Sequence, residues 1–404
     1  MTNRNIPILR RLGPGLITAS VVLGPGSIVA ASRAGAQGGY RLIWLLVTAG
    51  VLMAVYTSMG ARLGCALDMT PLAYVAKRAG RWLAVLGGIS AFLVAAGFQF
   101  VNNMGVALAA SGLTGTPGWV WPIVFTSLSL LFLFWAKHVY VFIERLMIAL
   151  VGIMILCFFT NLFWTGINLP KLFGGLIPRM AEGDALIARA MFPTTFSAVA
   201  AFYQAYLVQA KAWRRDQLPD AVRDAWAGIA ILGLISAAIL TGAAQTLHAT
   251  GGSFGNLGEL AKLLRESLGP AANLVFCCGL GAAAFSSFIV NAVIGGALLA
   301  DGLGLNADIN GRPTKVLASV AMLVGCGVAL ATFGLGAGTT TSLLIAQAST
   351  LVAAPLCAVL LLVMTSNRAI MGDLRNRLPT IILGCAGLAV VFWLCAMWLL
   401  DKIG

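Results

Sequence analysis

The run Gly24-Pro25-Gly26-Ser27 lies in the middle of an apolar stretch, residues 13–32, that is long enough to cross a bilayer. The proline lacks a backbone donor, and the two glycines lack side chains that would pack the turn, so we expect the helix to part here into two halves. A membrane helix broken in this way persists only where its freed backbone groups line a polar cavity or bind something. The run therefore predicts a broken membrane helix beside a binding site, as in a transporter.

The rest of the chain is similarly apolar. Of its 404 residues, 60% are hydrophobic and 10% are charged, which is outside the range of soluble domains. We predict an all-α polytopic membrane protein with a cytoplasmic segment, 1–12, followed by one transmembrane domain, 13–404. The eleven predicted transmembrane helices lie near residues 13–32, 41–63, 83–109, 119–137, 140–164, 186–210, 225–247, 271–300, 314–334, 341–365 and 380–400.

The net charge of +13 reflects the distribution of basic residues among the loops. Most of the 26 lysines and arginines fall on one side when alternate loops are assigned to opposite sides of the membrane. This bias predicts a cytoplasmic N terminus, an external C terminus and a location in a bacterial plasma (inner) membrane. The expected partners are the lipid bilayer and a small-molecule or ion substrate, with no nucleic acid and no obligate protein partner.

Acidic residues are scarce inside the predicted spans. Only Glu144 of the 13 acidic residues lies within an apolar segment, beside Arg145 near its inner end. Proton-driven carriers normally place an ionisable group in the membrane, and divalent cations need oxygen ligands to replace their hydration. We therefore predict no metal site built from acidic side chains. We also predict no enzyme, because the chain has neither a zinc-binding His-Glu-x-x-His run nor a buried pair of aspartates.

Neutral polar side chains occur at helical spacing in several spans. Gln99, Asn102 and Asn103 fall on one helix face, and comparable stripes occur in the sixth, eighth and tenth spans. Such residues often form hydrogen bonds between helices, but four stripes together favour a shared polar cavity. Besides those three, the stripes comprise Thr194, Ser197 and Gln204; Ser286, Ser287 and Asn291; and Gln347, Ser349 and Thr350.

An ordered series of short motifs resembles the NRAMP family of metal transporters over most of the chain. The resemblance implies two inverted five-helix repeats of the LeuT-like fold, here about 13–165 and 186–365, with broken helices 1 and 6 and an extra helix, 380–400. The motifs are Gly13-Pro14-Gly15, Gly24-Pro25-Gly26-Ser27, Gly35-Ala36-Gln37-Gly38-Gly39-Tyr40, Ala61-Arg62-Leu63-Gly64, Leu207-Val208-Gln209, Leu268-Gly269-Pro270, Ser366-Asn367-Arg368 and Met371-Gly372-Asp373-Leu374-Arg375-Asn376.

The chain departs from the family at the residues that the family uses for metal and protons. Gly24 and Ser27 stand where the family's first-helix motif has the metal-binding Asp and Asn. Ser197-Ala198-Val199 aligns with the sixth-helix Met-Pro-His, and Pro193, four residues earlier, is the predicted break in this helix. A further histidine aligns with Gln204. The third-helix Asp and Glu align with Gln99 and Asn102, whereas Gln347 keeps the tenth-helix glutamine.

These departures predict a secondary transporter for a small organic solute such as a carboxylate, alone or as a metal complex. The alternatives are a divalent metal ion (Mg²⁺ or Mn²⁺) transporter and a non-transporting sensor or scaffold. Ser27 is expected to cap the outer half-helix or to donate to an anion. No cofactor is expected; the coupling ion is Na⁺, bound by Ser286 and Ser287, or H⁺. The predicted substrate-binding residues are Gly24, Gly26, Ser27, Asn102, Thr194, Ser197, Gln204 and Gln347.

Overall fold

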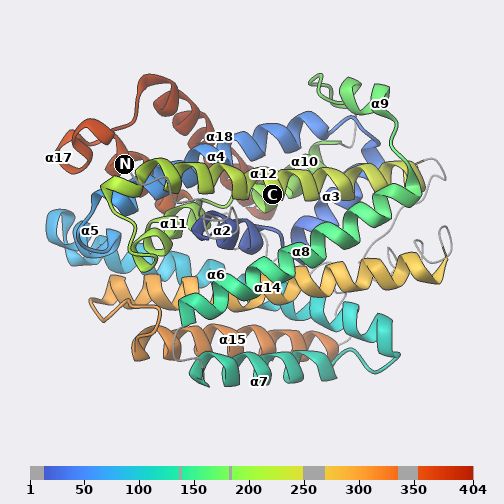
Figure 1. Cartoon of the computed structure of the whole chain (residues 1–404), viewed down its shortest axis with the longest axis horizontal. Helices are drawn as coiled ribbons and strands as arrows, with labels where there is room; N and C mark the ends of the chain where they lie inside the picture. Colours follow the sequence, from blue (N-terminus) through green and yellow to red (C-terminus); the bar gives the residue numbers. More distant parts are fainter. Residues whose placement is uncertain (1–12, 136–138, 182–183, 249–268, 335–353, 404) are drawn as a thin grey trace, which may run out of the picture.

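The computed structural model describes residues 13–135, 139–181, 184–248, 269–334 and 354–403, and within these ranges the chain is helical with connecting loops (Figure 1). The first half contains α2 (Pro14–Val22), α3 (Pro25–Gly38), α4 (Ile43–Ala66), α5 (Pro71–Ala79), α6 (Arg81–Thr114), α7 (Val120–Trp135), α8 (Val139–Thr165) and α9 (Leu169–Gly174). The second half contains α10 (Asp184–Thr195), α11 (Ala198–Ala210), η1 (Arg215–Gln217), α12 (Leu218–Ala243), η2 (Ala244–His248), α14 (Pro270–Leu303), α15 (Arg312–Gly334), the helix Ala354–Ser366, α17 (Arg368–Met371), η3 (Gly372–Leu374) and α18 (Leu378–Ile403).

The predicted class, an all-α polytopic membrane protein, is confirmed. Seven helices of the described ranges are long and apolar enough to cross a membrane, or up to nine if each of two bent pairs forms one span. The other two of the eleven predicted spans correspond to the 16-residue α7 and to α10 with α11, whose halves have 12 and 13 residues. The tenth predicted span begins outside the described residues, and the division into two repeats stays a prediction.

The first span is interrupted between α2 and α3, which are bent by 61°. Gly24 precedes α3 in an extended conformation, and Pro25 is the first residue of that helix. Proline suits a first helical position because the missing N–H has no partner within a helix there. The same missing donor prevents α2 from continuing into α3.

The sixth span is interrupted at Phe196 and Ser197, and not at Pro193 as predicted. Pro193 lies inside α10, which continues to Thr195. A proline weakens the turn that precedes it, but the start of the next helix depends on a residue that can cap it. Ser197 is that residue, since its hydroxyl accepts a hydrogen bond from the backbone N–H of Ala200 at 3.4 Å.

Helix α14 forms the centre of the bundle and packs against α6, α15, α8 and α2 (Figure 1). In its most apolar window, 89% of the residues are buried, whereas the corresponding share for α18 is 22%. Helices α2 and α12 approach closely at two glycines. Gly15 of α2 lies against the backbone of Asp224, and Gly228 of α12 lies against the backbone of Gly15, so a side chain at either glycine would collide with the opposite helix. The broken first span is therefore held between α12 on one side and α14 on the other.

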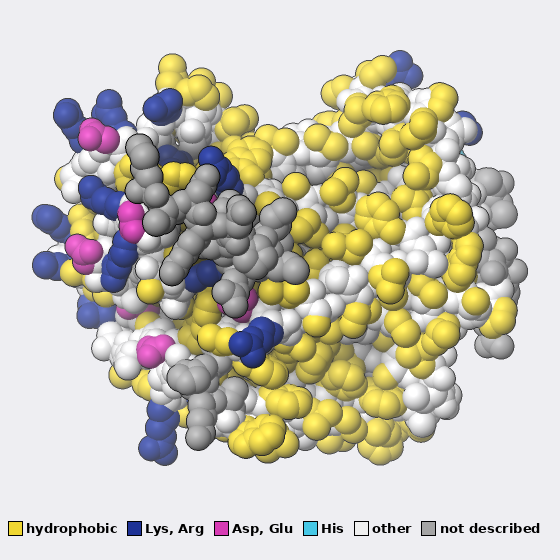
Figure 2. All heavy atoms as spheres, in the orientation of Figure 1, with side chains coloured by type: hydrophobic (Ala, Val, Ile, Leu, Met, Phe, Trp, Pro, Cys, Tyr) yellow, Lys and Arg dark blue, Asp and Glu magenta, His cyan; other side chains and the backbone are white. Residues whose placement is uncertain are grey.

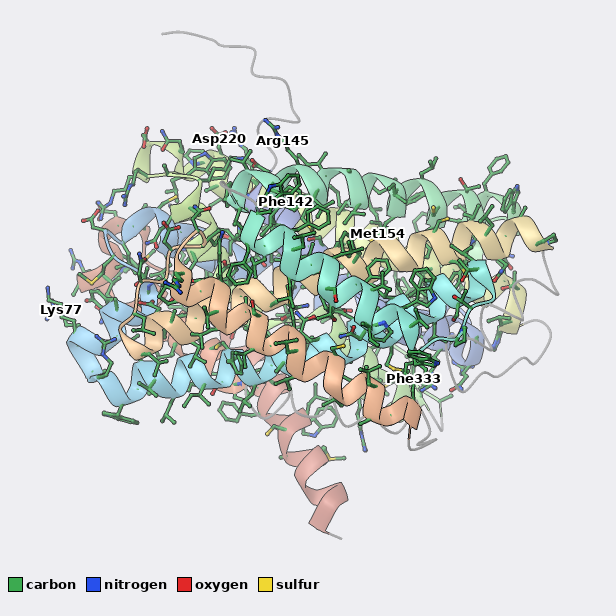
Figure 3. All side chains as sticks on the ribbon, turned by 90° about the horizontal axis from the view of Figure 1, so that it is seen from below. Lys77, Phe142, Arg145, Met154, Asp220 and Phe333 are labelled. Carbon is green, nitrogen blue, oxygen red and sulfur yellow. The ribbon has the colours of Figure 1, made fainter. Side chains whose placement is uncertain are left out.

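Charged side chains are concentrated at one end of the bundle. Figure 2 shows lysines and arginines gathered at the left end, where Figure 1 places α5 and α17, while the middle of this face is largely apolar. From below, Lys77 lies at the same end and Phe333 lies toward the other (Figure 3). An apolar belt with a basic end is the surface expected of a protein that crosses a bilayer.

Candidate functional site

The interruption of the first span frees two carbonyl groups at the end of α2. In a continuous helix, the Ser20 and Val21 carbonyls would accept from residues 24 and 25. Here the Gly24 N–H donates to Val22 instead, at 3.0 Å, and Pro25 has no N–H. Serines of α14 replace these donors. Ser287 Oγ lies 2.8 Å from the Ser20 oxygen and 3.0 Å from the Val21 oxygen, and Ser286 Oγ lies 3.4 Å from the Ser20 oxygen.

Gly24, Asn102 and Ser287 meet where α2, α6 and α14 converge. A Cβ atom placed on Gly24 would lie 3.0 Å from Ser287 Oγ and 3.4 Å from Asn102 Oδ1. On the same side, the ring of Pro25 rests against Gly105, where any side chain would collide with it. Asn102 is 1% exposed, and its Nδ2 has no hydrogen-bond partner in the described part of the chain. The interruption thus carries an unpaired amide beside freed backbone.

A second unpaired amide, that of Gln204, lies on α11, which packs against α2. Thr18 of α2 donates its hydroxyl to Gln204 Oε1 of α11 at 2.5 Å. The side chain of Gln204 is fully buried, and its Nε2 has no partner among the described residues. Buried polar atoms are normally paired, so each unpaired amide indicates a place for a ligand or water.

Ser27 lies at the start of the outer half-helix, as predicted, but makes a different hydrogen bond from a capping one. It is the third residue of α3, and its hydroxyl donates to the Gly24 carbonyl at 2.8 Å, so it does not cap the helix. Gly24 is the cap residue and makes no side-chain hydrogen bond. Gly26 is buried in the first turn of the same helix. The glycine allows the backbone at the break to be approached closely, while Ser27 satisfies one carbonyl there.

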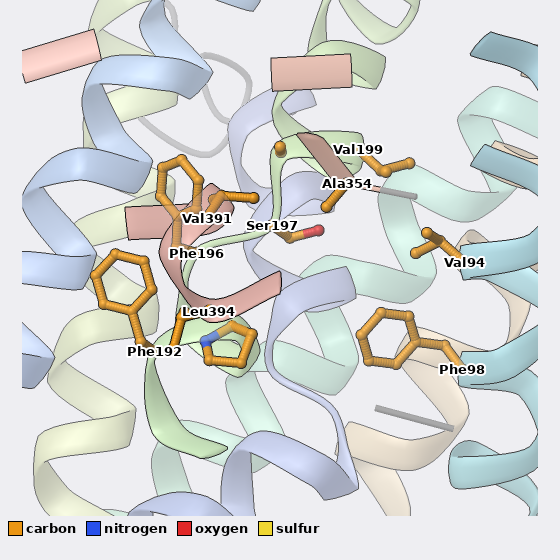
Figure 4. Close-up of a pocket in the computed structure, with 11 residues that line it drawn as sticks. Val94, Phe98, Phe192, Phe196, Ser197, Val199, Ala354, Val391 and Leu394 are labelled. Carbon is orange, nitrogen blue, oxygen red and sulfur yellow. The ribbon is translucent and has the colours of Figure 1, made fainter. Parts of the chain in front are cut away.

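Ser197 lines an apolar pocket whose lining includes neither Gly24 nor Asn102. Ser197 lies among carbon side chains that include Phe196, Val94 and Phe98, and the pocket has a volume of about 20 Å³, enough for a water molecule (Figure 4). The Thr194 hydroxyl donates within its own helix, to Met191 at 2.9 Å. Neither Thr194 nor Ser197 has a hydrogen bond to Gly24 or Asn102 in the described ranges. A shared site that joins them to the interruption of the first span stays a prediction.

Gln99 and Asn103 of the predicted α6 stripe take part in contacts with neighbouring helices, whereas the Nδ2 of Asn291 has no partner in the described ranges. Gln99 Nε2 donates to the Phe288 carbonyl of α14 at 2.6 Å, and Asn103 Nδ2 donates to the Gln99 carbonyl at 2.9 Å. Thr126 of α7 donates to Asn103 Oδ1 at 3.4 Å. Of the predicted stripe on α6, only Asn102 thus lies beside the Gly24 interruption. Gln347 lies outside the described residues.

Sequence reasoning missed Thr18 and Ser20, which contribute a hydroxyl and a carbonyl oxygen near the interruption. Both are polar residues in the last two turns of the first half-helix, and this position is the signal that could have identified them. Ser20 donates its own hydroxyl to Ile17 at 2.7 Å, so its contribution to the site is the carbonyl. A backbone carbonyl ligand cannot be recognised from the sequence, because any amino acid at that position would supply it.

Two buried carboxylates lie at helix N-termini away from the interruption. Asp224 of α12 accepts from the backbone N–H of Gly13 at 2.8 Å and of Gly15 at 2.6 Å, at the start of α2. Asp301 of α14 accepts from Leu72 and Ala73 at the start of α5. Negative charge is favourable at these ends because the helix dipole and unpaired N–H groups face it. The described residues contain no group of three or more His, Cys, Asp and Glu side chains that could hold a metal ion.

Comparisons with known proteins agree with this architecture. The divalent metal cation transporter MntH of Chromohalobacter salexigens is 30% identical over 90% of this chain and 85% of its own length. The crystal structure of a mutant of the Eremococcus coleocola manganese transporter superposes with a TM-score of 0.83, at 18% identity, over 98% of this chain and 88% of that one. The structure of MhsT in complex with L-phenylalanine gives 0.63, at 16% identity, over 95% and 98% of the two chains.

The structural likenesses confirm the predicted LeuT-like fold. The family match and the MntH relative support the prediction of an integral membrane transporter rather than an enzyme. The family model described as natural resistance-associated macrophage protein-like (Nramp) matches residues 15–401, which is nearly the whole chain. The chain belongs to the Nramp family.

Proposed function

We propose that this protein is a secondary transporter of a divalent metal ion, Mg²⁺ or Mn²⁺, which binds at the interruption between α2 and α3. The observation that carries the proposal is the meeting of Gly24, Asn102 and Ser287, where freed carbonyls and an unpaired amide share one buried place. The relative from Chromohalobacter salexigens is named a divalent metal cation transporter. The comparisons favour this alternative over the organic solute predicted from the sequence.

The chemistry of the site favours a hard cation that keeps part of its water shell. The nearby oxygen atoms belong to carbonyl, hydroxyl and amide groups, which suit Mg²⁺ or Mn²⁺ better than a softer transition metal. An amide can present its oxygen in place of its nitrogen by a half-turn. Because no carboxylate side chain touches Gly24, Asn102 or Ser287 within the described ranges, we expect weaker metal binding than a site with Asp at position 24 would give.

Gly24→Asp tests the proposal, with Gly24→Asn as the control of nearly equal size. Gly24 has φ −103° and can accept either residue without backbone strain, although Ser287 must shift slightly. A carboxylate beside a divalent ion contributes more than ~1 kcal/mol, so Mn²⁺ should bind about tenfold tighter to the Asp variant, measured by thermal shift and by uptake into proteoliposomes. Equal Mn²⁺ affinity in the wild type and both variants would place the substrate elsewhere.

A small organic solute such as a carboxylate, alone or as a metal complex, is the second candidate. It is favoured by the unpaired N–H groups of Asn102 and Gln204, which are donors for a carboxylate. Thermal shift with Mn²⁺, Mg²⁺, small carboxylates, amino acids and metal–citrate mixtures separates the candidates. A ligand at about one hundred times its dissociation constant stabilises the fold by roughly 2.7 kcal/mol. Ser27→Asp should weaken binding of an anion and spare or strengthen that of a metal ion.

The coupling ion proposed is Na⁺, at Ser286 and Ser287. Their hydroxyls, with the Ser20 and Val21 carbonyls, bring four oxygen atoms together between α2 and α14. In the structure Ser287 donates to these carbonyls, and Ser286 has the Ala283 carbonyl at 3.0 Å and the Ser20 carbonyl at 3.4 Å as acceptors, so a sodium ion would enter by turning the hydroxyl hydrogens away. Uptake in choline buffer tests the proposal: full activity without Na⁺ rejects it and leaves H⁺ as the alternative.

The basic end of the bundle is proposed to face the cytoplasm, with the N terminus inside and the C terminus outside. This orientation is supported by the lysines and arginines gathered there (Figure 2). Single cysteines introduced at Lys77 and Phe333 on a cysteine-free background test it with a membrane-impermeant thiol reagent. In intact cells, only the Phe333→Cys variant should be labelled.

A further inference from the structure

A basic pocket lies where the chain turns from the helix Ala354–Ser366 into α18. Its volume is about 610 Å³, and it is formed by the turn that contains α17 and η3. The motif Ser366-Asn367-Arg368 and the run 371–376, which no step of the proposed transport uses, make up most of this turn. The lining includes the side chains of Arg368, Arg375 and Arg377, with one acidic residue, Asp373.

The three guanidinium groups carry an uncompensated positive charge. All three arginines are exposed, and none forms an ion pair with an acidic residue of the described ranges. With Asp373 included, the formal charge of the lining is that of three cations and one anion. Guanidinium groups bind phosphate through two parallel N–H donors, which makes a cluster of them a good receptor for a phosphate group.

The turn that carries these arginines is held in place by hydrogen bonds to Thr365 and to Arg62 of α4. Asn376 is buried, its N–H donates to the Thr365 carbonyl at 2.9 Å, and its Nδ2 donates to Thr365 Oγ1 at 2.8 Å. Arg62 of α4 donates to Asn376 Oδ1 at 2.7 Å and to the Leu374 carbonyl at 3.2 Å. These bonds fix the backbone between Leu374 and Asn376, so Arg375 and Arg377 project from a braced segment.

An apolar surface begins at the edge of the same pocket. Leu378 and Ile381 complete its lining, and Leu378 is 70% exposed. Ile382 follows one turn later on α18 and is 58% exposed. Helix α18 is the least buried of the seven single-helix spans in the described ranges. Helix α17 lies at the basic end of the molecule (Figures 1 and 2), so the polar lining of the pocket there adjoins the exposed apolar residues Leu378 and Ile382 of α18.

We propose that this pocket binds the headgroup of an anionic phospholipid, with its phosphate on Arg368, Arg375 and Arg377 and its acyl chains along α18. The continuity of the pocket with Leu378 and Ile382 favours a lipid over a soluble phosphate, because only a lipid uses both surfaces. Each basic residue near an anionic membrane surface contributes ~1 kcal/mol. The site fixes α18, which has few protein contacts, in a defined position within the membrane.

The test is the change of Arg368, Arg375 and Arg377 together to Gln in the full-length protein. The matched control changes Lys77, Arg215 and Arg223 to Gln, which removes the same charge from exposed positions outside the pocket. Binding of phosphatidylglycerol to detergent-purified protein is titrated by native mass spectrometry, with phosphatidylcholine as the neutral lipid. The pocket variant should bind phosphatidylglycerol on the order of 100-fold more weakly than the wild type, and the control should change little.

Three results would overturn the proposal. Equal losses in the two triple variants would mean that overall charge, and not this pocket, attracts the lipid. Wild-type protein that binds phosphatidylcholine as well as phosphatidylglycerol would remove the role of the arginines. Displacement of the lipid by inorganic phosphate at equal concentration would show a site for a soluble anion. The last two measurements use wild-type protein only, so they decide the question even if the triple variant does not fold.

Discussion

The buried carboxylates and the interruption of the first span use polar groups in opposite ways. Asp301 Oδ2 lies 2.6 Å from the Tyr206 hydroxyl and 3.1 Å from the Leu72 N–H, and Asp301 Oδ1 lies 2.6 Å from the Thr70 hydroxyl. Asn102, beside the interruption, and Gln204, which accepts from Thr18 of α2, each keep an amide nitrogen unpaired in the described structure. Both carboxylates thus accept from N–H groups at helix N-termini, whereas the two amide nitrogens have no partner among the described residues.

This difference separates stabilising residues from candidate binding residues. A satisfied buried carboxylate stabilises the fold, and its removal exposes several donors without partners. An unpaired buried amide destabilises the fold, so its presence calls for another reason. Substitutions at the two kinds of position should therefore change stability in opposite directions.

The largest effect is expected from Asp301→Ala. The change leaves the Ala73 N–H and the Thr70 and Tyr206 hydroxyls without an acceptor, and the Leu72 N–H with only the Tyr206 hydroxyl oxygen, so the free energy of unfolding should fall by about 4 kcal/mol. Chemical denaturation in detergent measures it. Asp308→Ala, an exposed acid lining the same pocket as Asp301, is the control and should change stability little. Equal stability losses in Asp301→Ala and Asp308→Ala would mean that the buried hydrogen bonds of Asp301 do not stabilise the fold.

Asp224→Asn should have the second largest effect. The shape is kept, but one of the two carboxylate oxygens that accept from Gly13 and Gly15 becomes a donor, so a stability loss of about 2 kcal/mol is expected. Asp220→Asn, one turn earlier on α12, removes only a 3.9 Å ion pair with Arg223 and serves as the control. A loss no greater than that of the control would mean that Asp224 does not hold the start of α2.

Asn102→Leu should raise stability by about 1 kcal/mol and reduce transport. It removes the unpaired amide at little change in volume. Its neighbour Asn103 is paired with Gln99 and Thr126, so Asn103→Leu should lower stability instead. Denaturation and proteoliposome uptake are measured on both variants. If Asn102→Leu transported normally, the unpaired amide would have no role in binding.

Ser287→Ala is expected to have the smallest effect, a stability loss of about 0.5 kcal/mol. It removes the hydroxyl that donates to the Ser20 and Val21 carbonyls, but Ser286 lies 3.4 Å from the Ser20 oxygen and can replace one donor. The double change of Ser286 and Ser287 to Ala should lose more than the sum of the single changes, in the same denaturation assay. If the stability loss of the double variant equalled the sum of the two single losses, Ser286 and Ser287 would not replace each other as donors to the Ser20 carbonyl.

The sequence was sufficient for the helical class and for the first interruption, because Gly24-Pro25-Gly26 acts locally. It was insufficient at Pro193, where the end of α10 depends on capping of the next helix by Ser197. Helical spacing placed Gln99, Asn102 and Asn103 on one face but did not show which of them faces Gly24. The roles of Asp224 and Asp301 were also missed, since their partners lie 209 and 229 positions away at Gly15 and Leu72.

Helix α14 holds Ser286 and Ser287 at the interruption and Asp301 at the start of α5. Asp301 lies 14 positions after Ser287, which is about 20 Å along one uninterrupted helix. A tilt of α14 that breaks the contacts of Ser286 and Ser287 with α2 must also move Asp301 relative to α5, because a regular helix does not bend easily between the two points. Helix α14 can therefore act as a rigid connection: a displacement that releases α2 from Ser286 and Ser287 would also displace Asp301 and the start of α5 at the basic end of the protein.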